Sequence, residues 1–441
     1  MKILVLSNLY PPHHADTNDF RCEKVTEALR LRGHEPHVLT STHGMNAEQT
    51  GGHVERRLWL NDAYDHPLES GFFDLKKVET HNHRVLQETI TSFQPEVIYV
   101  WSLRGLSKSL VFALRNSRLP TVYDVADHWM ADDLRRDPWL GWWNRPGGPV
   151  LSKLGRSCLE WAAQRSRFDE SAPTRLMKGY DRLPNVFGDE AALASVPPNS
   201  IGEFRFDRLY FCSESLKNDT MQAGFRVSHA EVIRPGIATE LYVGEVKPAS
   251  TPVAKFLTVA RLEERGGVLA AVKALQAVRA IHGKTTLSIY GKGDSDYIAK
   301  VRSFAATNHL PIEFLPVSNL VRDLPAVYRR HDVLLHTAEW NEPYNSNILE
   351  AMACGLPVIG TALGGARELL RHGENALTFT PGHVEELAAR IHEIQTQPAL
   401  RVQMTETAQH EVLSKFNETV VIDQLENYLD TSREIWTQTA T

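Results

Sequence analysis

The sequence predicts an α/β protein built from two doubly wound domains. Short apolar segments alternate with segments of helical periodicity along most of the chain, which is the order of parallel strands and their covering helices. The 441 residues are too many for one ordinary domain. A polar stretch with two prolines and a glycine, residues 244–252, is typical of a linker. We therefore expect one domain over 1–245 and a second over 253–415, with a last helix over 416–441 that packs on the first domain.

The N-terminal half is divided by its periodicity. Apolar runs predict strands, and apolar residues near helical spacing predict helices, as in 20–33, where Gly33 is a C-terminal stop. Residues 42–73 follow neither pattern. The expected strands are 2–7, 35–41, 96–102, 120–127, 208–213 and 230–236, and the expected helices are 20–33, 74–93, 105–117 and 214–225.

A tryptophan-rich insertion over about 128–165 interrupts this rhythm. Five of the nine tryptophans fall there: Trp129, Trp139, Trp142, Trp143 and Trp161. They could pack in the core of a helical hairpin, stack on a bound sugar, or rest at a membrane interface beside Arg135, Arg136, Arg145 and Lys153. Core packing is favoured, because Asp127, Asp132, Asp133 and Asp137 dilute the local positive charge.

The C-terminal half repeats the alternation more cleanly. In sheets of this kind ligands bind beyond the carboxyl ends of the strands, so the residues that follow each strand are the candidates for a site. The expected strands are 255–260, 285–291, 312–316, 332–338 and 357–361, and the expected helices are 266–281, 295–308, 320–330, one from Ser346 or Asn347 to Ala353, 383–396, 399–414 and 417–435.

Composition excludes several classes of protein. The net charge of −6 offers no basic field for nucleic acid. The four cysteines are scattered singly, which suggests neither a zinc site nor a disulfide framework. The first apolar run is too short for a secretory signal, and no stretch of 18 apolar residues occurs. We expect a cytoplasmic protein that is soluble or attached at most to the inner face of a membrane; nothing in the sequence specifies an oligomeric state.

Two glutamates, Glu342 and Glu350, lie on either side of a polar turn that leads into a small-residue helix. One interpretation is structural, because Asn347 followed three residues later by Glu350 has the spacing of a capping box. The other is a ligand site, because free amides at a helix N-terminus suit a phosphate. Glu350 could then accept hydrogen bonds from ribose hydroxyls, and Glu342 from the hydroxyls of a sugar.

The segment "EPYNSNILEAMACGLPVIGTALGGARELLRHGENALTF", residues 342–379, resembles the E-x7-E signature of retaining GT-B glycosyltransferases of the family 4 type. The resemblance implies the GT-B fold, in which two Rossmann-like domains face each other across a cleft. It also implies transfer of a sugar, with retained configuration, from a UDP- or GDP-sugar to a glycan, a lipid-linked or another hydroxyl acceptor, as in polysaccharide biosynthesis. It implies no cofactor and no metal, although "DD" at 132–133 could suggest a metal pair.

The resemblance also implies residue roles in the C-terminal domain. Glu342 would contact the donor sugar and Glu350 the ribose, while the backbone amides near Ser346 and Asn347 would meet the diphosphate. Asn345 replaces the family's glycine, and asparagine tolerates the left-handed backbone conformation better than most residues. Two further pairs are implied beside the donor phosphates, the arginines Arg261 and Arg265 and the glycines Gly364 and Gly365.

In the N-terminal domain the resemblance implies roles for the strand-end residues Asp127 and His128. Ala15 and Asp16, or residues near them, stand where the family usually has two glycines. Two other functions remain open. One is a different GT-B enzyme, an epimerase or a hydrolase, and the other is a catalytically silent subunit that binds a sugar nucleotide.

Overall fold

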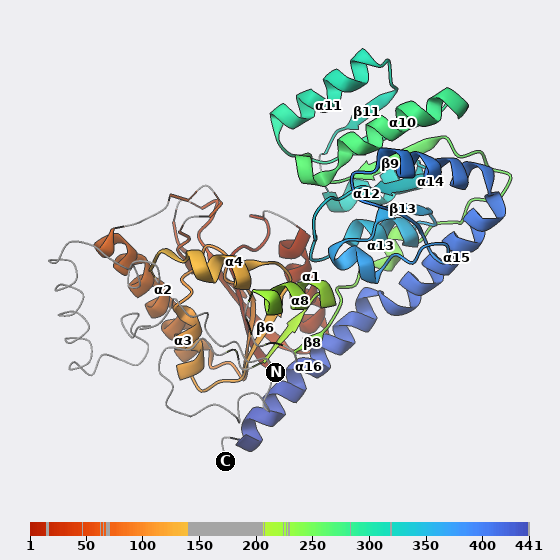
Figure 1. Cartoon of the computed structure of the whole chain (residues 1–441). Coiled ribbons are helices and arrows are strands. Elements are labelled where there is room, and N and C mark those ends of the chain that lie inside the picture. The colour runs from red at the N-terminus through yellow and green to blue at the C-terminus, as the bar shows by residue number, and fades with distance from the viewer. Residues whose placement is uncertain are drawn as a thin grey trace. The chain divides into compact units, whose positions relative to one another are not determined.

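The computed structural model forms two compact units. The N-terminal unit comprises Met1–Cys212, Leu216–Ile233 and Ile422–Thr441, and the C-terminal unit comprises Ser213–Ser215 and Arg234–Val421 (Figure 1). The structure describes residues 1–139 and 206–439, except 15, 16, 46, 62, 65, 68–70, 207, 224, 226, 228, 229, 283, 318 and 319.

The N-terminal unit contains an eight-stranded sheet in the order β3-β4-β2-β1-β5-β6-β7-β8. All pairings are parallel except that of β3 with β4, and Ile3 of β1 lies opposite Pro36 of β2 and Val97 of β5. The strands are β1 Lys2–Ser7, β2 Glu35–Ser41, β3 Gln49–Gly51, β4 Val54–Leu58, β5 Val97–Ser102, β6 Thr121–Val125, β7 Arg208–Phe211 and β8 Glu231–Val232. The helices are α1 Thr17–Leu31, α2 Phe72–Phe93, α3 Leu110–Asn116, α4 Trp129–Arg136, α8 Glu214–Gln222 and most of α16 Glu418–Thr439.

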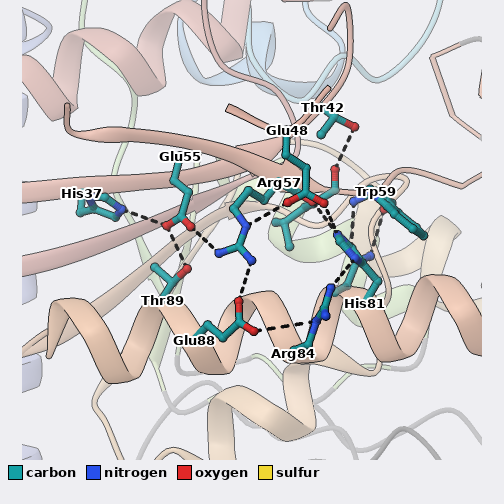
Figure 2. A network of polar contacts seen from close by, with 12 residues as sticks. His37, Thr42, Glu48, Glu55, Arg57, Trp59, His81, Arg84, Glu88 and Thr89 are labelled. Carbon is teal, nitrogen blue, oxygen red and sulfur yellow. Dashed lines mark hydrogen bonds and ion pairs between the residues drawn. The ribbon is translucent and has the colours of Figure 1, made fainter. Parts of the chain in front are cut away.

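The strands β3 and β4 were not predicted, because β3 has only three residues and β4 contains buried polar residues. Glu55 of β4 is 9% exposed and accepts hydrogen bonds from Arg57, from Thr89 of α2 and from His37 of β2 (Figure 2). Arg57 in turn pairs with Glu88 of α2 at 2.6 Å. The face of β4 toward α2 is thus held by ion pairs, so its sequence lacks the apolar alternation that indicates a strand.

The C-terminal unit contains a six-stranded parallel sheet in the order β11-β10-β9-β12-β13-β14. Neighbouring residues of one strand lie in different cores, since Phe256 packs in one apolar cluster and Leu257 in the other. Helices cover both faces: α10 packs against α14, and α13 against α15 (Figure 1). This is the doubly wound arrangement, and the predicted fold class is confirmed.

The bounds of the C-terminal elements agree with the predicted segments, except for the short helix α9 and the short strand β14, which were both missed. The strands are β9 Lys255–Val259, β10 Thr286–Tyr290, β11 Ile312–Leu315, β12 Val333–His336, β13 Val358–Thr361 and β14 Leu377–Phe379. The helices are α9 Thr239–Tyr242, α10 Val268–His282, α11 Ser295–Thr307, α12 Leu320–Arg329, α13 Ser346–Ala353, α14 Val384–Thr396 and α15 Pro398–Lys415, with short 3₁₀ turns at Glu264–Gly266 and Gly364–Glu368.

Two tryptophans of the 128–165 segment, Trp129 and Trp139, are each 1% exposed, and Trp129 packs edge-on against Phe206. Core packing is therefore what the structure shows for these two. The other residues of the predicted insertion, Trp142, Trp143, Trp161, Arg145 and Lys153, lie outside the described residues, as do Ala15 and Asp16.

Helix α16 packs within the N-terminal unit from Ile422 onward. Glu426 pairs with Arg32 at 2.6 Å and lies 2.8 Å from His34, and the Tyr428 hydroxyl donates to the backbone oxygen of Leu209 at 3.0 Å. Among the described helices, none has the length and apolarity needed to cross a membrane.

Candidate functional site

The candidate site lies at the carboxyl edge of the C-terminal sheet. Three loops meet there: residues 260–267 after β9, 337–345 after β12 and 362–368 after β13. Because β9, β12 and β13 are adjacent and parallel, their carboxyl ends fall side by side, which is where doubly wound sheets bind ligands.

The glycine pair Gly364 and Gly365 packs directly against the backbone that carries Glu342. A Cβ on Gly364, which has φ of +55°, would lie 2.3 Å from the Glu342 carbonyl oxygen, and one on Gly365 would lie 2.5 Å from that of Pro343. The Gly365 amide donates to the Glu342 carbonyl at 2.8 Å. These glycines therefore fix the position of Glu342, and their proximity to donor phosphates stays a prediction.

The loop of Arg261 and Arg265 is locked to the loop of Glu342 in the same way. Gly267 has φ of +67°, and a Cβ there would lie 1.8 Å from the Thr337 carbonyl oxygen. The Glu339 amide donates to the Arg265 carbonyl at 2.8 Å, and the Thr337 hydroxyl to that of Gly266 at 3.2 Å. Backbone contacts thus hold the two loops in one arrangement.

The Glu342 carboxylate is the centre of this site. It accepts hydrogen bonds from the Asn345 side-chain amide and from the side chain of Trp340. Burial raises the pKa of Glu342 to about 7, while the positive charges of Arg261 and Arg265 act to lower that pKa. The structure therefore brings Glu342 and both arginines together.

The two arginines differ in how they are held. The Arg265 guanidinium lies 4.4 Å above the Trp340 ring and donates to Glu263 at 2.7 Å, with about half of the side chain exposed. The pairing with Glu263 is the surface interpretation that the sequence also allowed. Arg261 is exposed, so its guanidinium lies within reach of solvent at the same edge.

The predicted capping box is wrong. Helix α13 begins at Ser346, so Glu350 lies in its second turn, and the N-cap residue Asn345 makes no side-chain capping bond. The Asn347 side chain instead donates to the Val259 carbonyl at 2.8 Å. Asn345 has φ of −127°, so it does not adopt the left-handed conformation for which a glycine would be needed.

Glu350 is 8% exposed and has tyrosine partners. The Tyr328 hydroxyl donates to Glu350 Oε2 at 2.9 Å, and Tyr242 also forms a side-chain hydrogen bond with this carboxylate. The charge of Glu350 helps to keep the pKa values of both tyrosines raised, after burial, which is the larger cause. Contact of Glu350 with a ribose stays a prediction.

His336, at the end of β12, was missed from the sequence. It is 5% exposed, and burial lowers its pKa to about 4, so the imidazole is neutral near pH 7. The Asn347 side-chain nitrogen lies 3.4 Å from His336 Nδ1. The signal was its place at the end of a buried strand, where a polar residue faces the same edge as the site.

Asp127 and His128 belong to the N-terminal unit. Asp127 accepts a hydrogen bond from the Trp129 amide at 2.7 Å, which caps α4, and lies 3.6 Å from Arg104; His128 is the N-cap residue of this helix. Asp127 thus has a structural task, and a role for either residue in binding stays a prediction. Within the described residues, no three His, Cys, Asp or Glu side chains group as a metal site requires.

Comparison with known structures defines the class of protein first. Two solved structures are similar over nearly their full length. Anabaena Alr3699/HepE in complex with UDP has a TM-score of 0.63 and 19% sequence identity, and the match covers 98% of this chain and 100% of that one. WaaG, a glycosyltransferase involved in lipopolysaccharide biosynthesis, has a TM-score of 0.59 and 14% identity, and the match covers 97% of this chain and 99% of that one. This chain has the GT-B fold.

The sequence comparisons then point to a family. Residues 245–411, less than half of the chain, match the model for glycosyl transferases group 1. The glycogen synthase of Mycobacterium tuberculosis is 29% identical over 235 residues, covering 52% of this chain and 55% of the relative. The N-acetyl-alpha-D-glucosaminyl L-malate synthase of Bacillus anthracis is 28% identical over 170 residues, which cover 37% of this chain and 44% of the relative. The chain thus spans about half the length of the curated relatives it matches.

Proposed function

We propose that this protein transfers a sugar from a nucleoside diphosphate sugar to a hydroxyl acceptor, with retention of anomeric configuration. The observation that carries the proposal is the grouping of Glu342 with Arg261 and Arg265 at the carboxyl edge of a sheet whose residues 245–411 match the group 1 family. Anabaena HepE, which shares this fold, has been crystallised with UDP and with UDP-glucose, and this makes a UDP-sugar the first donor to test.

The donor's diphosphate is proposed to lie between the two guanidinium groups and the first amides of α13, at Ser346 and Asn347. Both features favour negative charge, the arginines by their ionic charge and the helix by its unpaired N–H groups. Because the leaving nucleoside diphosphate gains charge as the sugar departs, these groups stabilise the transition state more than the ground state.

Glu342 is proposed to hold the sugar. Its backbone is fixed by Gly364 and Gly365 and its side chain by Asn345, so the carboxylate is positioned before a ligand arrives. Preorganised acceptors of this kind lose little entropy on binding. Glu350 is proposed to accept the ribose hydroxyls through oxygen lone pairs that Tyr328 and Tyr242 leave available, since a carboxylate can accept about four hydrogen bonds.

The reaction is proposed to take place on one face of the sugar. The acceptor oxygen bonds to the anomeric carbon as the bond to the diphosphate breaks, and the departing phosphate oxygen takes the acceptor proton. No side chain is then needed as a base. The acceptor, a glycan, a lipid-linked glycan or another hydroxyl compound, is proposed to bind to the N-terminal unit, where Asp127 and His128 are candidates for hydrogen bonds to its hydroxyls.

The test combines donor binding with the stereochemistry of the product. UDP-, GDP-, ADP- and dTDP-sugars are screened by the rise in melting temperature of the full chain, since a ligand that binds the folded state raises its stability. The double variant Arg261→Ala/Arg265→Ala should lose this rise and keep its own melting temperature. Arg330→Ala is the matched control, because Arg330 is exposed in the same unit and bonds only to a local carbonyl, that of Ala326, among the described residues.

Each outcome decides between the functions. An undiminished donor shift in the double variant would remove the proposed diphosphate site. Proton NMR of the product gives the anomeric configuration, and an inverted product would contradict the retaining mechanism. Donor turnover without an acceptor would indicate a hydrolase or an epimerase, and donor binding without turnover on any acceptor would indicate a silent binding subunit.

A further inference from the structure

The N-terminal unit contains a cavity of about 400 Å³ at the carboxyl edge of its own sheet. Its walls come from the segment after β4, with Asn61 and Tyr64, from the segment after β5, with Arg104 and Lys108, and from α4 and the residues after it, with Asp133 and Asp137. A volume of this size lies in the range of small-molecule sites, and the carboxyl edge is where such sheets bind ligands.

Ionisable groups are buried in the wall of this cavity at a cost in stability. Glu79, Lys108 and Asp137 are 4%, 2% and 5% exposed. Burial and the nearby charge of Asp137 raise the pKa of Glu79, and burial lowers the pKa of Lys108. Removing three ionisable groups from water around one cavity lowers the free energy of unfolding. Buried ionisable groups with shifted pKa values occur more often at functional sites than elsewhere.

The cations of the cavity are already committed to protein partners. The Lys108 ammonium donates to the carbonyls of Leu103 at 2.6 Å and Leu106 at 3.0 Å. The Arg104 guanidinium lies 3.6 Å from Asp127 and 3.6 Å from Asp133. A phosphate or carboxylate of a ligand would therefore have to compete with these protein partners for either cation.

The carboxylates are more available. Asp132, which also lines the cavity, is exposed, and Asp133 is 25% exposed and shares Arg104 with Asp127. With Asp137, which is 5% exposed and accepts a hydrogen bond from the Lys108 amide at 3.2 Å, they give three aspartates beside two cations. The cavity thus offers mainly hydrogen-bond acceptors and excess negative charge, and this favours hydroxyl and ammonium donors over anions.

We propose that this cavity binds the acceptor, and that it selects a hydroxyl-rich group bearing an amine, such as an amino sugar, over phosphorylated or carboxylated equivalents. The inference rests on the proposed function, because it supplies the acceptor for that transfer. Asp132 and Asp133 face the amine, and the polar wall at Asn61 and Tyr64 contacts the hydroxyls.

The first experiment measures binding of four hexoses that differ in one group. Glucosamine, glucose, glucose 6-phosphate and glucuronate are added at millimolar concentration to the full chain without a donor, and saturation-transfer NMR is recorded. We expect glucosamine to bind tightest, glucose more weakly, and the two anions not at all. Equal or tighter binding of either anion, or no binding of any of the four, overturns the proposal.

The second experiment locates the binding. Asp132→Asn should weaken glucosamine binding about five-fold, as expected when one partly exposed ionic contact is lost. Asp74→Asn is the matched control, since Asp74 is an exposed aspartate of the same unit, at the first turn of α2. Unchanged glucosamine binding by Asp132→Asn overturns the proposal.

The donor assay separates the two hypotheses. Asp132→Asn should keep the full UDP-sugar melting shift, because the donor site is built in the other unit. If no donor raises the melting temperature of the wild type, the proposed function is contradicted. If the wild type and Asp132→Asn bind glucosamine equally well, only the proposed acceptor cavity is contradicted.

Discussion

The two units carry the same kind of sheet, yet their carboxyl edges are built differently. In the C-terminal unit the loops are interlocked by backbone contacts, with Gly267 against Thr337 and Gly364 against Glu342. In the N-terminal unit the Asn61 amide also donates to the Gly105 carbonyl at 2.8 Å, but here the loops enclose a cavity lined by side chains, with Lys108 and Asp137 nearly buried. Backbone contacts tolerate few substitutions, whereas a side-chain lining can change charge and shape without altering the fold. The C-terminal edge is therefore constrained mainly by backbone geometry, and the N-terminal edge mainly by its side chains.

The largest effect is expected where the backbone contact is tightest. Gly267→Ala should destabilise the C-terminal unit by about 4 kcal/mol, because it adds a methyl group 1.8 Å from the Thr337 oxygen at a positive φ. Gly373→Ala also has positive φ but meets nothing within 4 Å, so it should cost only about 1 kcal/mol. Urea denaturation, with hydrogen exchange of peptides from β9 and β12, measures the stability of both variants. An equal loss of unfolding free energy in Gly267→Ala and Gly373→Ala would show that the contact with Thr337 is unimportant.

The N-terminal unit should depend instead on a buried charge. Asp124 of β6 is fully buried and accepts from Arg21 of α1 and, at 2.7 Å, from the Tyr210 hydroxyl. Arg21→Met leaves this carboxylate without its cation and should cost about 3 kcal/mol. Arg30→Met on the same helix removes an exposed pair with Glu27 and should leave the stability nearly unchanged, because solvent screens this pair. Hydrogen exchange in β6 reports the loss, and a stable Arg21→Met protein would refute this dependence.

Glu342 should make the C-terminal unit sensitive to pH. Its pKa in the folded protein, about 7, lies above the ordinary value of 4.5. The contribution of Glu342 to the free energy of unfolding is therefore fully present below pH 4.5 and is lost as the pH rises through 7. Glu342→Gln should remove about 2 kcal/mol of the loss between pH 5 and pH 8. Urea midpoints of both proteins at several pH values measure this; parallel curves would show that Glu342 titrates normally.

The smallest effect is expected at the tyrosine that contacts Glu350. Tyr328→Phe keeps the packing of a fully buried ring and removes one hydrogen bond, at a cost of about 1 kcal/mol. If Glu350 holds the ribose, freeing one of its lone pairs should leave the donor melting shift unchanged or increase it. A lost shift would show that Tyr328 is needed to position Glu350.

The sequence predicted the parts of the fold that rest on local pattern. β1, β9 and β12 are apolar runs, and each was predicted within two residues of its bounds. β4 was missed because Glu55 and Arg57 are stabilised in the strand by hydrogen bonds and ion pairs with residues of α2 and β2, and these partners are distant in sequence. β14 has three residues, too few to show a period.

The site was predictable where a motif was continuous and not where it was assembled by the fold. The resemblance over 342–379 pointed to Glu342 and to the glycine pair. The capping box failed because the Asn347 side chain bonds to Val259, a residue 88 positions earlier. The cavity of the N-terminal unit draws its walls from residues 61 to 138 and has no sequence period that could reveal it.

The membership of α16 sets an order on biosynthesis. The N-terminal unit includes Ile422–Thr441, which the ribosome makes after all of the C-terminal unit. Arg32, His34 and Leu209 therefore meet their partners Glu426 and Tyr428 only after the C-terminal unit has been synthesised. The half of the protein that is synthesised first is thus the half that is completed second, and a simple cut at the linker would yield an N-terminal fragment that lacks its closing helix.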